Sequence, residues 1–135
     1  MKKIQIHIDG ANNNEIKKYF NHVNGFTFNP SLFRKLGVKN YIGYTKTLLN
    51  LTKKKPLSIE VFADDEKNCL HQAKKISEIS KNIYVKIPIT YTSGKSTKKL
   101  IEKLSQLNIK LNITAIFTLD QIKEIYPVIK NKKHI

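Results

Sequence analysis

Short apolar stretches alternate along the chain with longer amphipathic stretches. The apolar stretches predict five β-strands, at 4–8, 25–28, 57–62, 83–88 and 109–113. The stretches between and after them predict helices at 13–21, 30–36, 40–52, 65–80, 96–107 and 119–129. Strands that alternate with helices indicate βαβ units and a parallel sheet. We therefore expect an α/β fold with about five βα units.

Each predicted strand carries apolar side chains on one face and polar side chains on the other. In the first strand, Ile4, Ile6 and Ile8 share a face, and His7 and Asp9 share the opposite one. A parallel sheet that is covered on both faces has nearly continuous apolar strands instead. The single glycine of the turn after this strand also fits neither a Rossmann nor a P-loop fingerprint. The pattern therefore favours a barrel, with the apolar face against outer helices.

The polar face of each predicted strand has a polar residue near its C-terminal end. The active site of a barrel lies at that end of the strands. We expect these residues to converge on one small volume, and edge strands with one solvated face are the alternative. The residues are Asp9, Asn29, Glu60, Lys86, Asn112 and Thr114.

Lys86 is the most informative of these residues, because it lies between two β-branched apolar residues. Removal from water disfavours the charged form of an amine, and a neutral amine can attack a carbonyl to form a Schiff base. Glu60 and Asp9 would provide carboxylates for acid–base chemistry. An ion pair between Lys86 and Glu60 is a structural role that is compatible with this chemistry. The neutral groups of Asn29, Asn112 and Thr114 would orient a polyhydroxylated substrate.

The length and composition exclude several classes of protein. A chain of 135 residues with 40% hydrophobic and 26% charged residues is typical of one globular domain without a membrane-spanning segment. Cys69 is the one cysteine, so no internal disulfide can form and we expect the protein to be cytoplasmic. We also expect the Cys69 side chain to lie in the core. The four histidines lack the spacing of metal ligands, so no metal site is expected.

The net charge of +15 raises the question of a nucleic-acid-binding protein. Arg34 is the only arginine, however, whereas base and phosphate recognition favours the bidentate guanidinium group. We therefore expect the lysines to form a solvated surface and not a nucleic-acid interface. A basic nucleic-acid-binding module stays as the alternative function.

Five segments, in order, resemble the transaldolase family, whose members are class I, Schiff-base (β/α)8 TIM barrels. The resemblance spans nearly the whole chain and is closest to the small, single-domain members. The matching segments are His7-Ile8-Asp9-Gly10-Ala11, the segment Gly25 to Leu32, Ser58-Ile59-Glu60-Val61-Phe62-Ala63, Val85-Lys86-Ile87-Pro88-Ile89-Thr90 and the segment Lys110 to Phe117.

The resemblance implies roles for individual residues. The Schiff-base lysine of the family falls on Lys86, its acid–base aspartate on Asp9 and the glutamate that assists imine formation on Glu60. Its substrate-orienting residues fall on Asn29, Thr27, Asn112 and Thr114. The implied reaction moves a three-carbon dihydroxyacetone unit between sugar phosphates, with no metal or organic cofactor. Related fructose-6-phosphate-type aldolases usually carry Gln at the position of Glu60, so the resemblance favours transfer.

The length suggests an incomplete barrel. A full barrel has about 250 residues, and the chain stops at Lys132-Lys133-His134-Ile135, about where a sixth strand would begin. The family's phosphate-binding serine and arginine lie on later strands. We expect residues 1–135 to be the N-terminal portion of one barrel domain, truncated before the sixth strand. An inactive fragment is therefore a further alternative. The sequence is also compatible with a homo-oligomer.

Overall fold

The computed structural model describes residues 4–10, 12–53 and 55–132. One sheet contains five parallel strands in chain order. The strands are β1 (His7–Asp9), β2 (Gly25–Phe28), β3 (Leu57–Glu60), β4 (Ile83–Pro88) and β5 (Leu111–Thr114). The helices are α1 (Asn13–Tyr19), the short 3-10 helix η1 (Phe20–His22), α2 (Pro30–Lys35), α3 (Tyr41–Leu51), α4 (Glu66–Ser77), α5 (Lys98–Gln106) and α6 (Leu119–Ile129).

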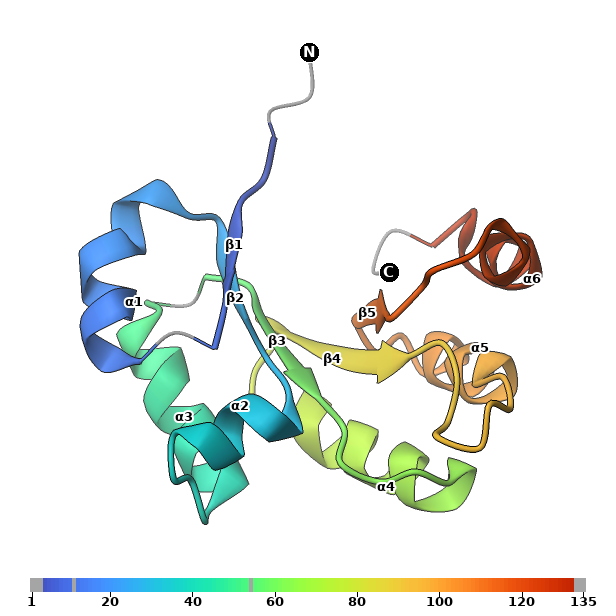
Figure 1. The fold of residues 1–135 in the computed structure, drawn as a ribbon, viewed down its shortest axis with the longest axis horizontal. Coiled ribbons are helices and arrows are strands. Elements are labelled where there is room, and N and C mark those ends of the chain that lie inside the picture. The colour runs from blue at the N-terminus through green and yellow to red at the C-terminus, as the bar shows by residue number, and fades with distance from the viewer. Residues whose placement is uncertain (1–3, 11, 54, 133–135) are drawn as a thin grey trace.

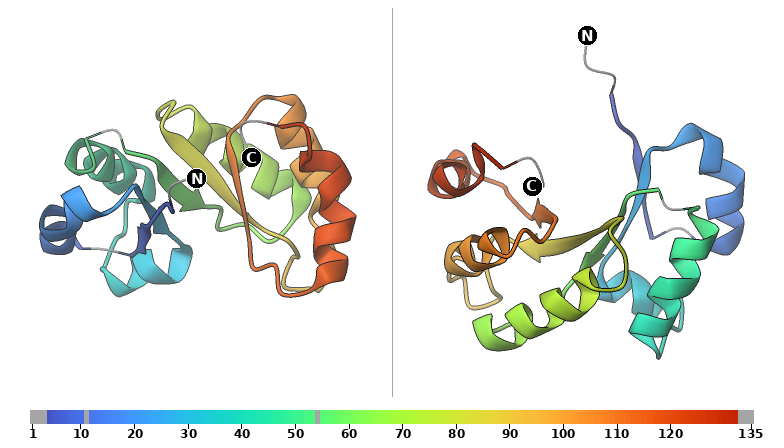
Figure 2. Two further views of the ribbon diagram at one scale, coloured as in Figure 1. Left: turned by 90° about the horizontal axis from the view of Figure 1, so that it is seen from above. Right: turned by 180° about the vertical axis from the view of Figure 1, so that it is seen from behind.

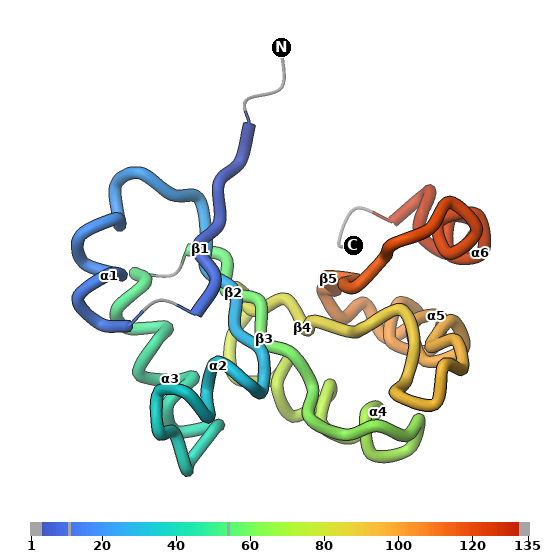
Figure 3. The backbone as a smooth tube through the Cα atoms, viewed as in Figure 1, coloured from blue at the N-terminus to red at the C-terminus, as the bar shows by residue number. Residues whose placement is uncertain are grey.

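The sheet is curved, and the helices follow its outer side (Figures 1 and 2). The backbone trace in Figure 3 shows β1 and β5 at opposite ends of this curved sheet. Sequential parallel strands with a helical connection after each one are the arrangement of the first five units of a TIM barrel. The predicted fold class, an α/β partial barrel, is confirmed. Ala11 of the first family segment and residues 133–135 lie outside the described residues.

Side-chain caps determine where several helices begin. Asn12 and Glu15 form a capping box at the start of α1, in which each side chain binds the main chain of the other. Asp65 accepts a hydrogen bond from the main-chain N–H of Asn68 at the start of α4. Each of these two caps lies in the loop that follows a strand, so it starts the helix that connects this strand to the next.

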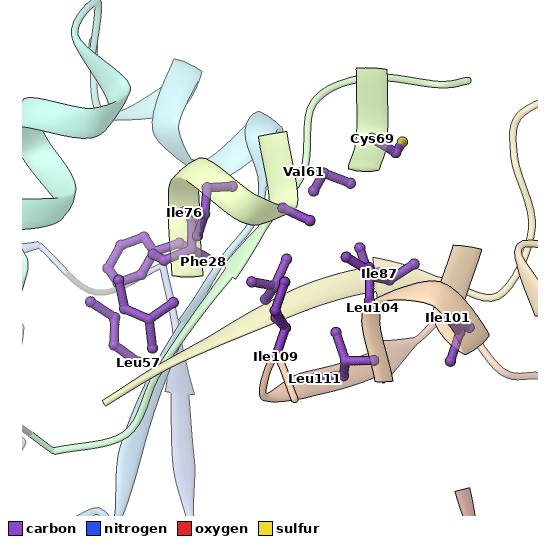
Figure 4. Close-up of a cluster of buried hydrophobic side chains, with 14 of the residues drawn as sticks. Phe28, Leu57, Val61, Cys69, Ile76, Ile87, Ile101, Leu104, Ile109 and Leu111 are labelled. Atoms are coloured by element: carbon purple, nitrogen blue, oxygen red, sulfur yellow. The ribbon is translucent and has the colours of Figure 1, made fainter. Parts of the chain in front are cut away.

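The hydrophobic core lies between the outer face of the sheet and the helices (Figure 4). The strands contribute Phe26, Phe28, Leu57, Ile59, Val85, Ile87 and Leu111, and the helices contribute Ile16, Phe33, Leu48, Ala73, Ile76, Leu100, Ile101 and Leu104. Cys69 is 2% exposed in this core, which confirms its predicted position, and burial raises the pKa of its thiol to about 11. Such a thiol is protonated at neutral pH and is a poor nucleophile. No described helix is both long and apolar enough to cross a membrane.

The first strand differs from the prediction. The strand begins at His7 and not at Ile4, because Asn24 binds the main chain of Ile6 with both its side-chain oxygen and its main-chain N–H. Ile8 packs against the core, but Ile4 and Ile6 are 87% and 54% exposed. The prediction that all three isoleucines pack on outer helices is therefore wrong for the first two.

The third strand is shorter than predicted and ends at Glu60. The main-chain N–H groups of Phe62 and Ala63 donate to the side-chain oxygen of Gln72, so the chain leaves the sheet here. Phe62 does not continue the inner face and instead contacts Tyr41 on the helix side, with ring centroids 3.9 Å apart. Similarly, α5 begins at Lys98, because the preceding Ser96 pairs with Thr90 in an antiparallel bridge.

Gly25 allows the close approach of His7 on the inner face of the sheet. A Cβ atom at residue 25 would lie 2.6 Å from Cε1 of the His7 ring and 2.7 Å from the main-chain oxygen of Pro56. We predict that Gly25→Ala lowers the free energy of unfolding by about 1–3 kcal/mol, the usual cost of overpacking. Denaturant titration measures this change. His7→Ala in the same chain should recover only part of the loss, because the Pro56 oxygen stays in place. An unchanged midpoint for Gly25→Ala would contradict the close approach.

Candidate active site

An ion pair between Lys86 and Glu60 lies on the inner face of the sheet. The two residues are register partners on β4 and β3, and the Lys86 Nζ lies 3.4 Å from a Glu60 carboxylate oxygen. Only 12% of the Lys86 side chain and 17% of the Glu60 side chain are exposed. The neighbours of Lys86 along β4 face the core, so the amine is the polar end of an otherwise apolar strand segment.

Burial raises the pKa of the Glu60 carboxyl above its ordinary value. The charge of Asp9 acts in the same direction, whereas the Lys86 ammonium lowers this pKa. The three charged groups therefore interact, although they come from β1, β3 and β4. A carboxyl with a raised pKa beside an amine can exchange protons at a pH closer to neutrality.

Asp9 and Thr27 form a second pair on the inner face, at the ends of β1 and β2. They are register partners, and the Thr27 hydroxyl donates a hydrogen bond to an Asp9 carboxylate oxygen. This contact fixes one carboxylate oxygen of Asp9, and no hydrogen bond from the described residues reaches the other. Asp9 is the more exposed of the two candidate carboxylates.

Asn112 is the register partner of Lys86 on β5. Its side-chain Nδ2 donates a 3.0 Å hydrogen bond to the hydroxyl of Ser58 on β3. This bond passes across β4 and leaves the Asn112 carbonyl oxygen available as an acceptor. Ser58, which is 3% exposed, is a residue of the site that the sequence reasoning did not select. Its position two residues before Glu60, on the same strand face, is the signal that could have identified it.

Asn29 and Thr114 lie near the strand ends, but the described contacts include no hydrogen bond from their side chains to Lys86, Glu60 or Asp9. The side-chain oxygen of Asn29 accepts a 2.9 Å hydrogen bond from the main-chain N–H of Leu32 and caps α2. The cap uses the oxygen of this side chain and not its amide nitrogen. Thr114 ends β5 opposite Pro88, two residues beyond Asn112, and is half-buried. The structure therefore brings Lys86, Glu60, Asp9, Thr27 and Asn112 together more closely than these two.

Tyr41 supports the site from the helix side of the sheet. Its hydroxyl donates a hydrogen bond to the main-chain oxygen of Glu60. Burial, together with the charge of Glu60, raises the pKa of the Tyr41 hydroxyl far above its ordinary value. The hydroxyl therefore stays protonated and fixes the end of β3. This contact joins residues 19 positions apart, which sequence periodicity does not reveal.

A cavity of about 460 Å³ lies next to this group, one inward-facing position closer to the N-terminal ends of the strands. Polar side chains on its wall include His7, Ser58, Tyr84 and Asn112. Within residues 4–10, 12–53 and 55–132, no three His, Cys, Asp or Glu side chains are grouped to hold a metal ion. The described side chains of the inner face offer an amine, two carboxylates, an amide and several hydroxyls.

The raised pKa of Glu60 can be tested residue by residue. We predict that a ¹³C NMR titration places the pKa of the Glu60 carboxyl above 4.5, its ordinary value. Lys86→Met should raise it further, because the opposing ammonium is lost, and Asp9→Asn should lower it. A value at or below 4.5, or shifts in the reverse sense, would contradict this description of the site.

The same shift predicts the pH dependence of stability. Because the folded pKa of Glu60 exceeds the unfolded value, its contribution to stability is complete below about pH 4.5 and is lost as the pH rises through the folded pKa. The wild-type chain should therefore lose stability relative to Glu60→Gln over that interval. Urea midpoints of both chains measure the difference, and a pH-independent difference would show that the shift is absent.

Ser58 should fix the orientation of the Asn112 amide. We predict that Ser58→Ala lowers stability by about 1 kcal/mol, the typical value of one hydrogen bond, and speeds hydrogen exchange of the Asn112 side-chain amide several-fold. Thr114→Val is the matched control, because it removes another hydroxyl from the inner face of the sheet. If both variants change Asn112 exchange equally, Ser58 has no specific role.

Comparison with known proteins agrees with this architecture. Residues 6–131 match the family model described as Transaldolase/Fructose-6-phosphate aldolase. Proteins described as "Probable transaldolase" are 35% identical over 116 residues in Thermoanaerobacter sp. (strain X514), 33% over 120 residues in Dehalococcoides mccartyi and 38% over 116 residues in Clostridioides difficile. These matches cover 84%, 87% and 84% of this chain, but only 51%, 54% and 51% of the relatives. The chain therefore spans about half the length of the curated relatives that it matches. On these matches and its parallel βα architecture, it belongs to the transaldolase/fructose-6-phosphate aldolase family.

Proposed function

We propose that the chain carries the imine-forming half of a transaldolase-type active site, with Lys86 as the nucleophile. The observation that carries this proposal is the position of Lys86, which is 12% exposed on the inner face and lies 3.4 Å from Glu60. A shielded lysine beside a carboxylate is the arrangement that imine chemistry needs, because the amine must lose a proton before it attacks. Family membership supports the same reaction class.

In the proposed reaction, the Lys86 Nζ attacks the ketone carbon of a ketose phosphate. The carbonyl oxygen leaves as water after it takes up protons, with Glu60 as the proton carrier, and a protonated imine remains. Asp9 then removes the proton of the donor hydroxyl, the adjacent carbon–carbon bond breaks and its electron pair moves into the imine. An aldose leaves, and the three-carbon enamine on Lys86 attacks an acceptor aldehyde, whose oxygen takes the proton back from Asp9. Addition of water releases the product and restores the free amine.

The remaining polar residues would hold the substrate. Thr27 orients the Asp9 carboxylate through its hydrogen bond. Asn112 would offer its free carbonyl oxygen to a substrate hydroxyl, because Ser58 holds its amide nitrogen. We assign weaker orienting roles to Thr114 and to the amide nitrogen of Asn29.

Transfer and free aldol cleavage use the same imine, so a fructose-6-phosphate-type aldolase is the second candidate. The family resemblance favours transfer, because related fructose-6-phosphate-type aldolases usually carry Gln at the position of Glu60. The two reactions differ in their need for an acceptor aldehyde. Without an acceptor, release of many equivalents of glyceraldehyde 3-phosphate from fructose 6-phosphate would indicate the aldolase, whereas a transaldolase stops after one equivalent per site.

Reductive trapping tests the role of Lys86. Dihydroxyacetone contains the three carbons that would be transferred and has no phosphate, so it does not need a phosphate site. We predict that dihydroxyacetone with borohydride labels Lys86 at least tenfold faster than any other lysine, as measured by peptide mass spectrometry. Lys86→Met should lose this fast adduct.

Lys110→Met is the matched control for this experiment, because the Lys110 amine lies 5.4 Å from the Tyr84 ring near the inner face. That variant should keep the adduct on Lys86. Labelling of Lys86 at the rate of the surface lysines would overturn the proposed function. Such a result would favour the inactive-fragment alternative.

A further inference from the structure

Ser105 on α5 carries a buried hydroxyl without a hydrogen-bond partner. The residue is 2% exposed, and its Oγ forms no hydrogen bond with any described residue. Within the described part of the chain, no other buried side-chain nitrogen or oxygen is left in this state. An unpartnered buried hydroxyl destabilises a fold, so its presence calls for a physical reason. A bound molecule that completes the hydrogen bond is one such reason.

The Ser105 side chain lines a groove of about 310 Å³ between α5 and the end of α6. These two helices lie side by side on the outer side of the sheet (Figures 1 and 2). Both walls of the groove therefore belong to the described chain. The wall from α5 consists of Lys98, Glu102, Ser105 and Gln106, and the opposite wall consists of Pro127, Val128 and Lys132.

The charged side chains of the groove are held in place by the local backbone. Lys98, Glu102 and Ser105 follow each other at i, i+4 and i+7, so they share one face of α5. Lys98 is half-buried, whereas its neighbour Lys99 is exposed. The main-chain N–H of Lys132 donates a 2.9 Å hydrogen bond to the last residue of α6. The ion pairs among the described residues involve none of the charged groove residues.

The chemistry of the walls selects a ligand class. The ammonium groups of Lys98 and Lys132 form strong, charge-assisted hydrogen bonds with phosphate oxygens, and the Ser105 hydroxyl can donate one more. The Glu102 carboxylate repels a phosphate but accepts hydrogen bonds from hydroxyl groups, as does the Gln106 amide. The groove therefore suits a small molecule with a phosphate at one end and hydroxyl groups at the other.

We propose that this groove binds a small hydroxylated phosphate monoester. Lys98 and Lys132 hold the phosphate, and the Ser105 hydroxyl donates to one of its oxygens. Glu102 and Gln106 accept hydrogen bonds from the hydroxyl groups. The bound molecule joins α5 to the end of α6 and stabilises their packing. The groove is on the helix side of the sheet, whereas the candidate active site is on the inner face, so this inference does not rest on the proposed reaction.

The test is a ¹H–¹⁵N NMR titration of the 135-residue chain with glycerol 3-phosphate, inorganic phosphate or glycerol. We expect saturable shifts of the Ser105 and Gln106 amides with glycerol 3-phosphate, with a Kd of about 1 mM or tighter. Inorganic phosphate should bind at least about threefold more weakly, because it lacks the hydroxyl contacts. Glycerol alone should cause no saturable shift. Hydrogen exchange of the α6 amides should slow when glycerol 3-phosphate is bound.

Ser105→Ala separates a ligand contact from a structural role. Without ligand, this variant should keep or raise the urea midpoint, because the unpartnered hydroxyl is lost, yet it should weaken glycerol 3-phosphate binding about fivefold. Ser77→Ala is the matched control, because the Ser77 hydroxyl on α4 donates a 2.7 Å hydrogen bond to the main-chain oxygen of Lys74. The control should lower the urea midpoint and leave binding unchanged.

Lys98→Met should weaken glycerol 3-phosphate binding about tenfold, as expected for the loss of a charge-assisted hydrogen bond. Lys99→Met is the matched control on the same helix and should bind like the wild type. Lys86→Met should also bind like the wild type, which separates this test from failure of the proposed function.

Three results would overturn the proposal. Absence of saturable shifts at Ser105 would leave the groove to water alone. Equal weakening by Lys98→Met and Lys99→Met would show attraction by surface charge and not a site. Equal affinity for inorganic phosphate and glycerol 3-phosphate would contradict the hydroxylated ligand class.

Discussion

The ion pair between Lys86 and Glu60 is the interaction on which the site depends. Two charges that leave water are costly, and pairing offsets part of that cost for these two side chains on the inner face. The parallel register of β3 and β4 places them opposite each other, at 3.4 Å. Tyr41 holds the main chain of Glu60 from behind, and the apolar neighbours of Lys86 fix β4 against the helices.

The pair lies on the polar face of a sheet whose two faces differ in every strand. The outer face of every strand supplies the core with aliphatic and aromatic side chains, and the inner face carries hydroxyl, amide, carboxylate and amine groups. In most barrels the inner layers are filled by branched apolar residues. Here Ser58, Tyr84 and His7 place polar groups on the wall of a cavity next to the charged pair, although aliphatic residues such as Leu111 and Ile113 also line it. A polar interior of this kind needs precise hydrogen bonds, such as the one between Ser58 and Asn112.

Much of this arrangement could be predicted from the sequence, because the strand period of two separates the faces wherever a strand is long enough. The α/β alternation follows from the order of apolar and amphipathic stretches, and the inward position of Lys86 beside Glu60 follows from the strand period. The ends of strands were less predictable, since single side chains decide them. The side-chain oxygen of Asn24 accepts a hydrogen bond from the main-chain N–H of Ile6, and that of Gln72 accepts one from Phe62. A local hydropathy pattern reveals neither contact. Ser58 and Tyr41 were missed for a related reason, because their roles depend on partners 54 and 19 positions away.

A double-mutant cycle on the ion pair tests the central claim most directly. The chains are Lys86→Met, Glu60→Gln, the double variant and the wild type, and the measurement is the free energy of unfolding at neutral pH. If the two charges depend on each other on the inner face, Lys86→Met lowers the free energy of unfolding more in the wild-type chain than in the Glu60→Gln chain, and this difference is a coupling of about 1 kcal/mol or more. Additive losses would show that the two groups are solvated independently and would contradict the account.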